Sequence, residues 1–179
     1  MTNLQKSKYN WIAQQAKDTA LKIGIEQLSI ADLAKHLGIG AATIYRYFKN
    51  SKNLIIKIGV MLWNDIYLFL KSKKLKKSGY ENLELFFGSF LELFINNNRL
   101  FHFADAFDQM LFKENVHKDD LTEYNDVILR IKNLYDEIYK QGILDHSMKD
   151  VEKDVFYFSS THMLFALCKK LSIQKNLIP

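Results

Sequence analysis

A single proline, at the last position, is the feature that most constrains the fold of this chain. Proline breaks helices and interrupts central strands, yet Pro179 is the only one in 179 residues. The seven glycines are thinly spread, and 48% of the residues are hydrophobic. This composition argues against disorder and supplies a substantial core. The sequence therefore predicts an all-α protein, and no segment is a convincing strand.

Apolar residues recur at three- and four-residue spacing, which is typical of amphipathic helices. Gly24, Gly38 and Gly142 are predicted helix stops. We expect helices over about residues 4–23, 29–37, 41–48, 52–71, 80–95, 99–112, 119–141 and 149–173, with 99–112 forming one helix or two. The helix over 52–71 would join an N-terminal domain, residues 1–51, to a helical body, residues 52–179.

Positive charge is concentrated near the N-terminus. The first 60 residues contain nine lysines and arginines and three acidic residues, whereas the remainder contains sixteen and seventeen. A basic head on a near-neutral body is typical of nucleic-acid-binding proteins. From charge alone, a solvated lysine-rich surface explains the pattern equally well.

Cysteine content and hydropathy indicate the cellular compartment of the protein. The single cysteine, Cys168, lies in an apolar run and is expected to be a buried free thiol in a reducing compartment. No stretch reaches about eighteen consecutive apolar residues, and residues 1–10 lack the apolar core of a signal peptide. We therefore expect a cytoplasmic protein that does not enter a membrane.

Residues 28–48 have the pattern of a helix-turn-helix. Gly38 provides the tight turn, where a positive φ is often required, and Ile39 fills the corner. The inward positions are apolar: Ile30, Leu33, Ala34 and Leu37 in the first helix, and Ile44 and Phe48 in the second. An ordinary helical hairpin with a polar face is the alternative. The turn glycine, the inward residues, the hydroxyls and the basic charge together favour DNA binding.

The outward face of the second helix suits the major groove. Ala41 and Ala42 are small enough to approach base edges, and Tyr45 can reach a base or a phosphate. The helix N-terminus, which starts at Gly40, itself favours an anion. Phosphate contacts are expected from Ser29, Thr43, Tyr47 and Lys52.

Over about residues 11–59 the sequence resembles the TetR family of transcriptional regulators. Residues 30–39 look like the family's second helix and turn, and Thr43-Ile-Tyr-Arg-Tyr-Phe48 followed by Lys52 is close to its signature. The resemblance implies the base and phosphate contacts named above. Two positions depart from the pattern, since Gly40 stands where a serine or threonine commonly caps the helix and Tyr47 replaces a frequent histidine.

By this resemblance the body would be an all-α domain for ligand binding and dimerisation. Its last two long helices would pair with those of a second subunit, although burial within one subunit is a competing account. The predicted interface residues are Ile128, Tyr135, Phe158, His162 and Phe165. A two-fold homodimer would place two recognition helices about 34 Å apart on a pseudo-palindromic operator in double-stranded DNA.

A dense aromatic zone covers the helix over 80–95 and the segment after it. These rings could line an apolar effector pocket or simply fill the core. The predicted pocket residues are Trp63, Tyr67, Phe86, Phe90, Phe94, His102, Phe107 and Met110.

Catalytic and metal-binding motifs are missing from the sequence. His102 and Asp105 form an isolated pair, and there is no zinc-protease, phosphate-loop or nucleophile motif. The sequence therefore predicts a DNA-binding regulator that is not an enzyme and has no cofactor or metal. By the resemblance it is a repressor released by a small apolar or aromatic effector. The alternative is a DNA-binding protein without an effector, whose body binds another protein.

Overall fold

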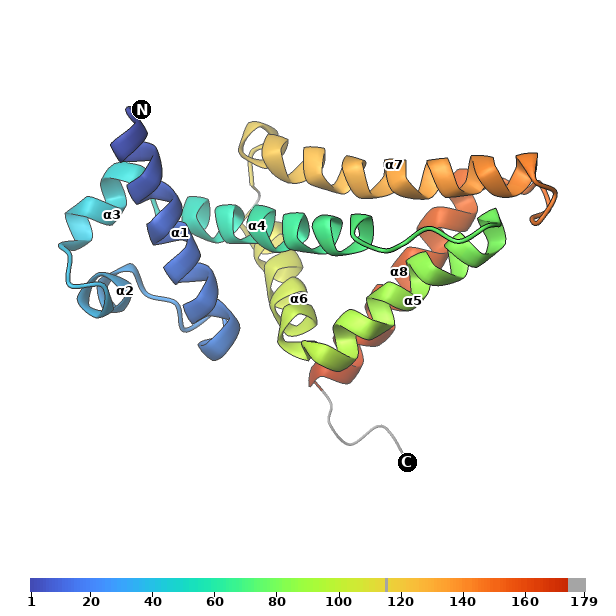
Figure 1. Ribbon diagram of the computed structural model, residues 1–179. Coiled ribbons are helices and arrows are strands. Elements are labelled where there is room, and N and C mark those ends of the chain that lie inside the picture. The colour runs from blue at the N-terminus through green and yellow to red at the C-terminus, as the bar shows by residue number, and fades with distance from the viewer. Residues whose placement is uncertain (115, 174–179) are drawn as a thin grey trace. The chain divides into compact units, whose positions relative to one another are not determined.

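The computed structural model describes residues 1–114 and 116–173. Within these ranges the chain is helical and contains no strand, which confirms the all-α prediction (Figure 1). The elements are α1 (Asn3–Ile23), α2 (Ile30–His36), α3 (Ala41–Tyr47), α4 (Ser51–Lys71), α5 (Gly79–Asn96), α6 (Asn98–Lys113), the 3-10 turn η1 (Lys118–Leu121), α7 (Thr122–Leu144) and α8 (Lys153–Ile173).

The helices form two compact units. The first comprises Met1–Trp63 and Phe103–Tyr124, and the second comprises Asn64–His102 and Asn125–Pro179. The sequence-based boundary after residue 51 divides the chain differently. Instead, the first part of α4 and most of α6 pack with the N-terminal helices.

The first unit is built around an apolar face of α1. Ile12, Ala13 and Ala16 are fully buried there, and Gly24 ends the helix with φ 89°, both as the sequence predicts. The core also contains Ile58 of α4 and Phe107 of α6, each fully buried. These two helices approach closely at Gly59, where an added Cβ would lie 2.7 Å from the Phe107 ring.

The second unit has an aromatic core. Tyr135 of α7 is fully buried and packs 6.1 Å from the Phe86 ring and 4.8 Å from the Tyr157 ring, measured between centroids. Phe165 of α8 packs against both Phe90 and Phe101, at 5.2 and 5.3 Å. Two of these rings, Phe86 and Phe90, are predicted pocket residues, and both are buried.

Ion pairs join α7 to the start of α8. Lys132 Nζ lies 2.9 Å from carboxylate oxygens of both Asp136 and Asp154, and Lys153 Nζ lies 3.0 Å from Asp136. Burial alone would raise the pKa of Asp136, but the hydrogen bonds from the two lysines hold it below its usual value. The network is partly shielded, since the Asp136 side chain is 27% exposed.

Two predicted helix boundaries are wrong. Gly142 does not end a helix, because α7 continues to Leu144 and Gly142 is buried where α7 meets the first residue of α5, Gly79. The last helix begins at Lys153 rather than near Lys149. The Tyr139 hydroxyl explains the later start: it accepts from the Val151 amide at 2.9 Å and donates to the Asp150 carboxylate at 2.8 Å.

Among the described helices, α4 alone is long and apolar enough to cross a bilayer by length and composition. Half of its most apolar window is buried inside the protein. Leu54, Ile58 and Leu62 of this helix belong to the core of the first unit. The core helix of a soluble protein meets the same criteria.

Candidate DNA interface

The turn between α2 and α3 has the geometry of a helix-turn-helix. Ser29 caps α2, and its Oγ accepts from the Asp32 amide at 3.2 Å. Gly38 has φ 64°, the left-handed conformation expected for this turn. The Ile39 amide then donates to the Ala34 carbonyl at 3.0 Å, which closes the end of α2.

One face of α3 is anchored in the core and the other is open. Ile44 is fully buried and Phe48 is 2% exposed, so both inward positions are as predicted. On the opposite side Tyr45 is 51% exposed, and Ala42 and Arg46 are also exposed. An apolar anchor with small and hydrogen-bonding groups opposite is what a groove-binding helix requires.

The start of α3 lacks a side-chain cap. Gly40 is the N-cap residue, and no side chain accepts a hydrogen bond from the first turn. The Thr43 amide donates to the Gly40 carbonyl at 2.8 Å, and the Ala41 and Ala42 amides at the helix start can face an anion such as a DNA phosphate. Ala41 and Thr43 are half-buried beside this opening, and so is Ser29 at the start of α2.

Tyr47 is held by contacts with α1. Its ring lies 6.5 Å from the Tyr9 ring in an edge-on arrangement, and the Arg46 guanidinium lies 5.3 Å from its centroid. Tyr9 also stacks on Phe48 at 4.6 Å. Burial, and secondly the Glu123 carboxylate, raises the pKa of Tyr9 to about 12. Tyr9 therefore stays neutral at physiological pH and supports the last turn of α3.

Lys52, a predicted phosphate contact, has an intramolecular partner. Its Nζ lies 3.2 Å from the Glu114 carboxylate and donates to the Glu114 carbonyl oxygen at 3.3 Å. Lys57, one and a half turns further along α4, pairs with Glu123 at 2.6 Å. Both acceptors belong to the segment that leads from α6 into α7, which packs in the first unit.

Sequence reasoning placed Arg46 on the solvent side without giving it a role, and it missed the two glutamates. Arg46 follows Tyr45 and is exposed. Its outward position in the second motif helix is the signal that could have identified it as a further positive charge at the candidate interface. Glu114 and Glu123 lie 62 and 66 residues from their lysines. No local pattern links residues that far apart in the sequence.

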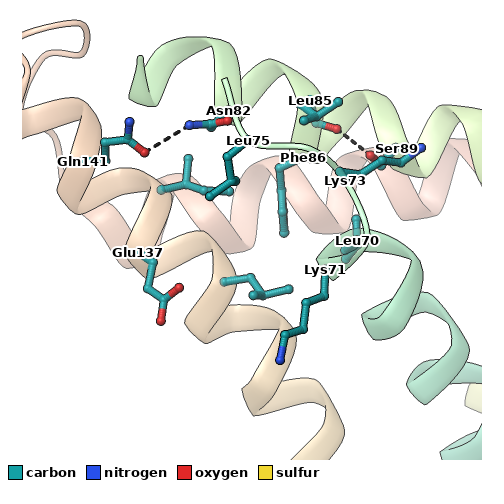
Figure 2. Close-up of a pocket in the computed structure, with 12 residues that line it drawn as sticks. Leu70, Lys71, Lys73, Leu75, Asn82, Leu85, Phe86, Ser89, Glu137 and Gln141 are labelled. Atoms are coloured by element: carbon teal, nitrogen blue, oxygen red, sulfur yellow. Dashed lines mark hydrogen bonds between the residues drawn. The ribbon is translucent and has the colours of Figure 1, made fainter. Parts of the chain in front are cut away.

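A cavity of about 320 Å³ lies in the second unit, between α5, α7 and the chain that follows α4 (Figure 2). Its walls are mainly aliphatic, with Leu70, Leu75, Leu85, Leu134 and Ile138, and Phe86 is its one aromatic residue. The amides of Asn82 and Gln141 bond to each other at 3.0 Å, and the Ser89 hydroxyl donates to the Leu85 carbonyl at 2.6 Å. Lys71, Lys73 and Glu137 supply its charged groups.

The predicted pocket residues are dispersed. Phe86 lines the cavity just described. Trp63, Phe107 and Met110 belong to the first unit, whereas Tyr67, Phe90, Phe94 and His102 belong to the second. Phe90 and Phe107 are fully or almost fully buried, and His102 is exposed. The sequence left open whether these rings line a pocket or fill the core, and the burial of Phe90 and Phe107 fits the core.

The predicted interface residues also have different environments. Phe158 is 46% exposed and His162 is exposed on the same side of α8. Ile128 is half-buried. Tyr135 is fully buried, and Phe165 is half-buried and packs on other rings of its own unit.

Cys168 is buried as expected, and burial raises the pKa of its thiol.

Among the described residues, no group of three or more His, Cys, Asp or Glu side chains could hold a metal ion.

Comparison with known sequences identifies the first unit. Residues 12–58 match the family described as "Bacterial regulatory proteins, tetR family". An HTH-type transcriptional regulator of Staphylococcus aureus is 26% identical over 144 residues, which cover 78% of this chain and 75% of that protein.

Solved structures share the whole fold. A TetR family transcriptional regulator from Thermus thermophilus has a TM-score of 0.68 at 17% identity, covering 88% of this chain and 84% of that one. The fatty acid degradation regulator FadR from Bacillus halodurans has a TM-score of 0.71 at 18% identity, covering 96% and 87%. The similarity therefore extends through both units.

Proposed function

The chain belongs to the TetR family of transcriptional regulators, and we propose that it is a dimeric repressor released from its operator by a small apolar effector. As a regulator with a DNA-binding helix-turn-helix, it is not an enzyme. The operator contacts, the dimer and the effector are the parts of the proposal that need testing.

The observation that carries the DNA contacts is the open face of α3. Tyr45 is half exposed beside Ala42, and the uncapped amides at Gly40 lie at the start of the same helix. We expect Ala41, Ala42 and Tyr45 to meet base edges, with Ser29, Thr43 and Tyr47 on phosphates.

Selection of bound sequences from random duplex DNA, followed by fluorescence anisotropy at fixed salt, tests this assignment. Tyr45→Ala should weaken operator binding by about 10-fold, which corresponds to one good contact. Tyr80→Ala is the matched control, because Tyr80 is 50% exposed on α5 in the other unit. Equal affinities for the two variants would refute the role of α3.

The dimer proposal is supported by four exposed apolar residues on α8. Val155, Phe158, Met163 and Leu167 are 66%, 46%, 73% and 51% exposed. Val155 and Phe158 are three residues apart and Met163 and Leu167 are four apart, so the members of each pair share a side of the helix. Several large apolar side chains exposed on one helix are typical of a protein interface, and a second copy also provides the two-fold symmetry of a pseudo-palindrome.

Sedimentation at micromolar concentration tests the dimer. Phe158→Glu should produce a monomer, because the interface would bury an unpaired charge. Leu91→Glu, at a 45% exposed position on α5, is the control and should remain dimeric. A wild-type monomer would refute the dimer, and a dimer that Phe158→Glu leaves intact would refute the placement of its interface on α8.

For the effector we propose the cavity in the second unit. It is at the lower end of the usual size of ligand sites. The amides at one end already bond to each other (Figure 2), so a ligand gains mainly from aliphatic contacts. The Bacillus halodurans neighbour is named as a fatty acid degradation regulator. Linear alkyl compounds are therefore the first probes.

Thermal unfolding with 1-octanol and octanoate tests the cavity. A ligand of the folded state should raise the melting temperature in a concentration-dependent way and weaken operator binding. Leu134→Phe narrows the cavity and should remove the shift, whereas Leu129→Phe, at a 55% exposed position on the same helix, should keep it. If no probe shifts either transition, a body that binds another protein becomes the better account.

A further inference from the structure

The ammonium group of Lys52 occupies an anionic site inside the first unit. It contacts both the carboxylate and the carbonyl oxygen of Glu114, at 3.2 and 3.3 Å. The Glu114 amide donates to Met110, so Glu114 directly follows the last turn of α6. The C-terminal end of a helix carries unpaired carbonyls and partial negative charge. Lys52 therefore bonds to acceptors similar to those that a DNA phosphate would offer.

We propose that Glu114 competes with DNA phosphate for Lys52, so that free protein withholds this lysine from DNA. The inference rests on the proposed function, because it concerns the strength of the same DNA interface. DNA must displace Glu114 before Lys52 can reach the backbone. By thermodynamic reciprocity, the Lys52–Glu114 pair weakens DNA binding by the same factor by which bound DNA weakens the pair.

The exposure of the pair makes this exchange feasible. The side chains of Lys52 and Glu114 are 30% and 55% exposed, so water and DNA can reach both. A pair of this kind contributes little stability, and replacing it by a phosphate contact changes affinity by about two- to five-fold.

Lys57 and Glu123 provide a contrast. Lys57 is 21% exposed, its Nζ is only 2.6 Å from Glu123, and it lies 5.6 Å from the Tyr9 ring. This lysine is enclosed by its partners on two sides. We therefore assign the Lys57–Glu123 pair to holding the first unit together and the Lys52–Glu114 pair to the competition.

The test is anisotropy with a fluorescein-labelled random-sequence duplex of about 30 base pairs, long enough for the half-site spacing of a dimer, over a salt series. Glu114→Gln should bind about two- to five-fold more tightly than wild type at low salt. Glu114→Asp keeps the charge but shortens the side chain, so it should also tighten binding. Lys52→Gln should weaken binding and lower the salt slope by about one.

The double variant separates competition for Lys52 from the general effect of removing a negative charge near the DNA. In the Lys52→Gln background, Glu114→Gln should have no more effect than Glu123→Gln has in wild type. Equal tightening with and without Lys52 would overturn the proposal, and so would weaker binding by Glu114→Gln. If neither the wild type nor any variant binds the duplex, the proposed DNA binding fails. This result differs from failure of the competition alone, in which the wild type still binds. Far-UV circular dichroism confirms that each variant is folded.

Discussion

Gly79 and Gly142 mark a close crossing of α5 and α7. A Cβ at Gly79 would overlap the backbone nitrogen and Cα of Gly142 and lie 3.0 Å from the carbonyl carbon of Gln141. Backbone atoms cannot rotate away, so Gly79→Ala would push the helices apart by roughly 1 Å or more to reach normal van der Waals separation. Overpacking of this kind costs about 3 kcal/mol. The lower entropy of the unfolded chain returns less than about 1 kcal/mol.

Gly88 on the same helix is the matched control. It is exposed, and a Cβ there would meet nothing within 4 Å. Gly88→Ala should therefore stabilise the protein by about 0.5–1 kcal/mol. The same chemical change at two positions of α5 should thus move stability in opposite directions.

Urea unfolding followed by circular dichroism at one protein concentration measures both effects. With a slope of about 2 kcal/mol/M, Gly79→Ala should lower the midpoint by about 1 M and Gly88→Ala should raise it by a few tenths. Because Asn82 and Gln141 line the cavity close to this crossing, Gly79→Ala should also reduce any alkyl-probe shift. A midpoint within about 0.2 M of wild type would refute the close crossing.

Three further predictions concern stability and its pH dependence. Gly40→Ser should raise the free energy of unfolding by about 0.5–1 kcal/mol, because the hydroxyl can cap α3 and a Cβ there meets nothing within 4 Å; a decrease in a denaturant titration would contradict this. Gly59→Ala should cost about 1–2 kcal/mol through the Phe107 ring, and Phe107→Leu in the same chain should recover part of the loss; additive losses would argue against the contact. The lowered pKa of Asp136 means that its ion pairs stabilise the fold fully above the unfolded value near 4 and lose that effect as pH falls through the lower folded value; Asp136→Asn should therefore flatten the acid limb of the stability curve, and an unchanged limb would exclude the network as its cause.

Local patterns predicted the first unit well, because its decisive signals lie close together in sequence. Gly24 and Gly38 both have positive φ, as their places after apolar runs indicated. The inward residues Ile44 and Phe48 are buried. A turn and two short helices are specified by only about twenty consecutive residues, and the local preference of each residue agrees with the structure of its neighbours.

Predictions for the second unit were weaker, because its signals are not local. Gly142 follows an apolar stripe and was therefore interpreted as a helix stop, but it serves a contact with a residue 63 positions away. Aromatic side chains gave no basis for separating a ring in the core from a ring in a pocket. That distinction depends on which helices pack together, and Phe86 alone of the predicted residues lines the described cavity.

The charge of the head shows how three-dimensional packing changes an inference from sequence. Residues 1–60 carry a net charge of +6, but residues 103–124, which pack in the same unit, contain two basic and six acidic residues. The unit as a whole therefore carries a net charge of +2, and two lysines of α4 already have carboxylate partners. Long-range attraction to DNA is correspondingly weaker than the N-terminal sequence suggests. The proposed binding would then depend on short-range groups on α3, and in the proposed competition a lysine released from Glu114 would add its charge only once phosphate is close enough to compete.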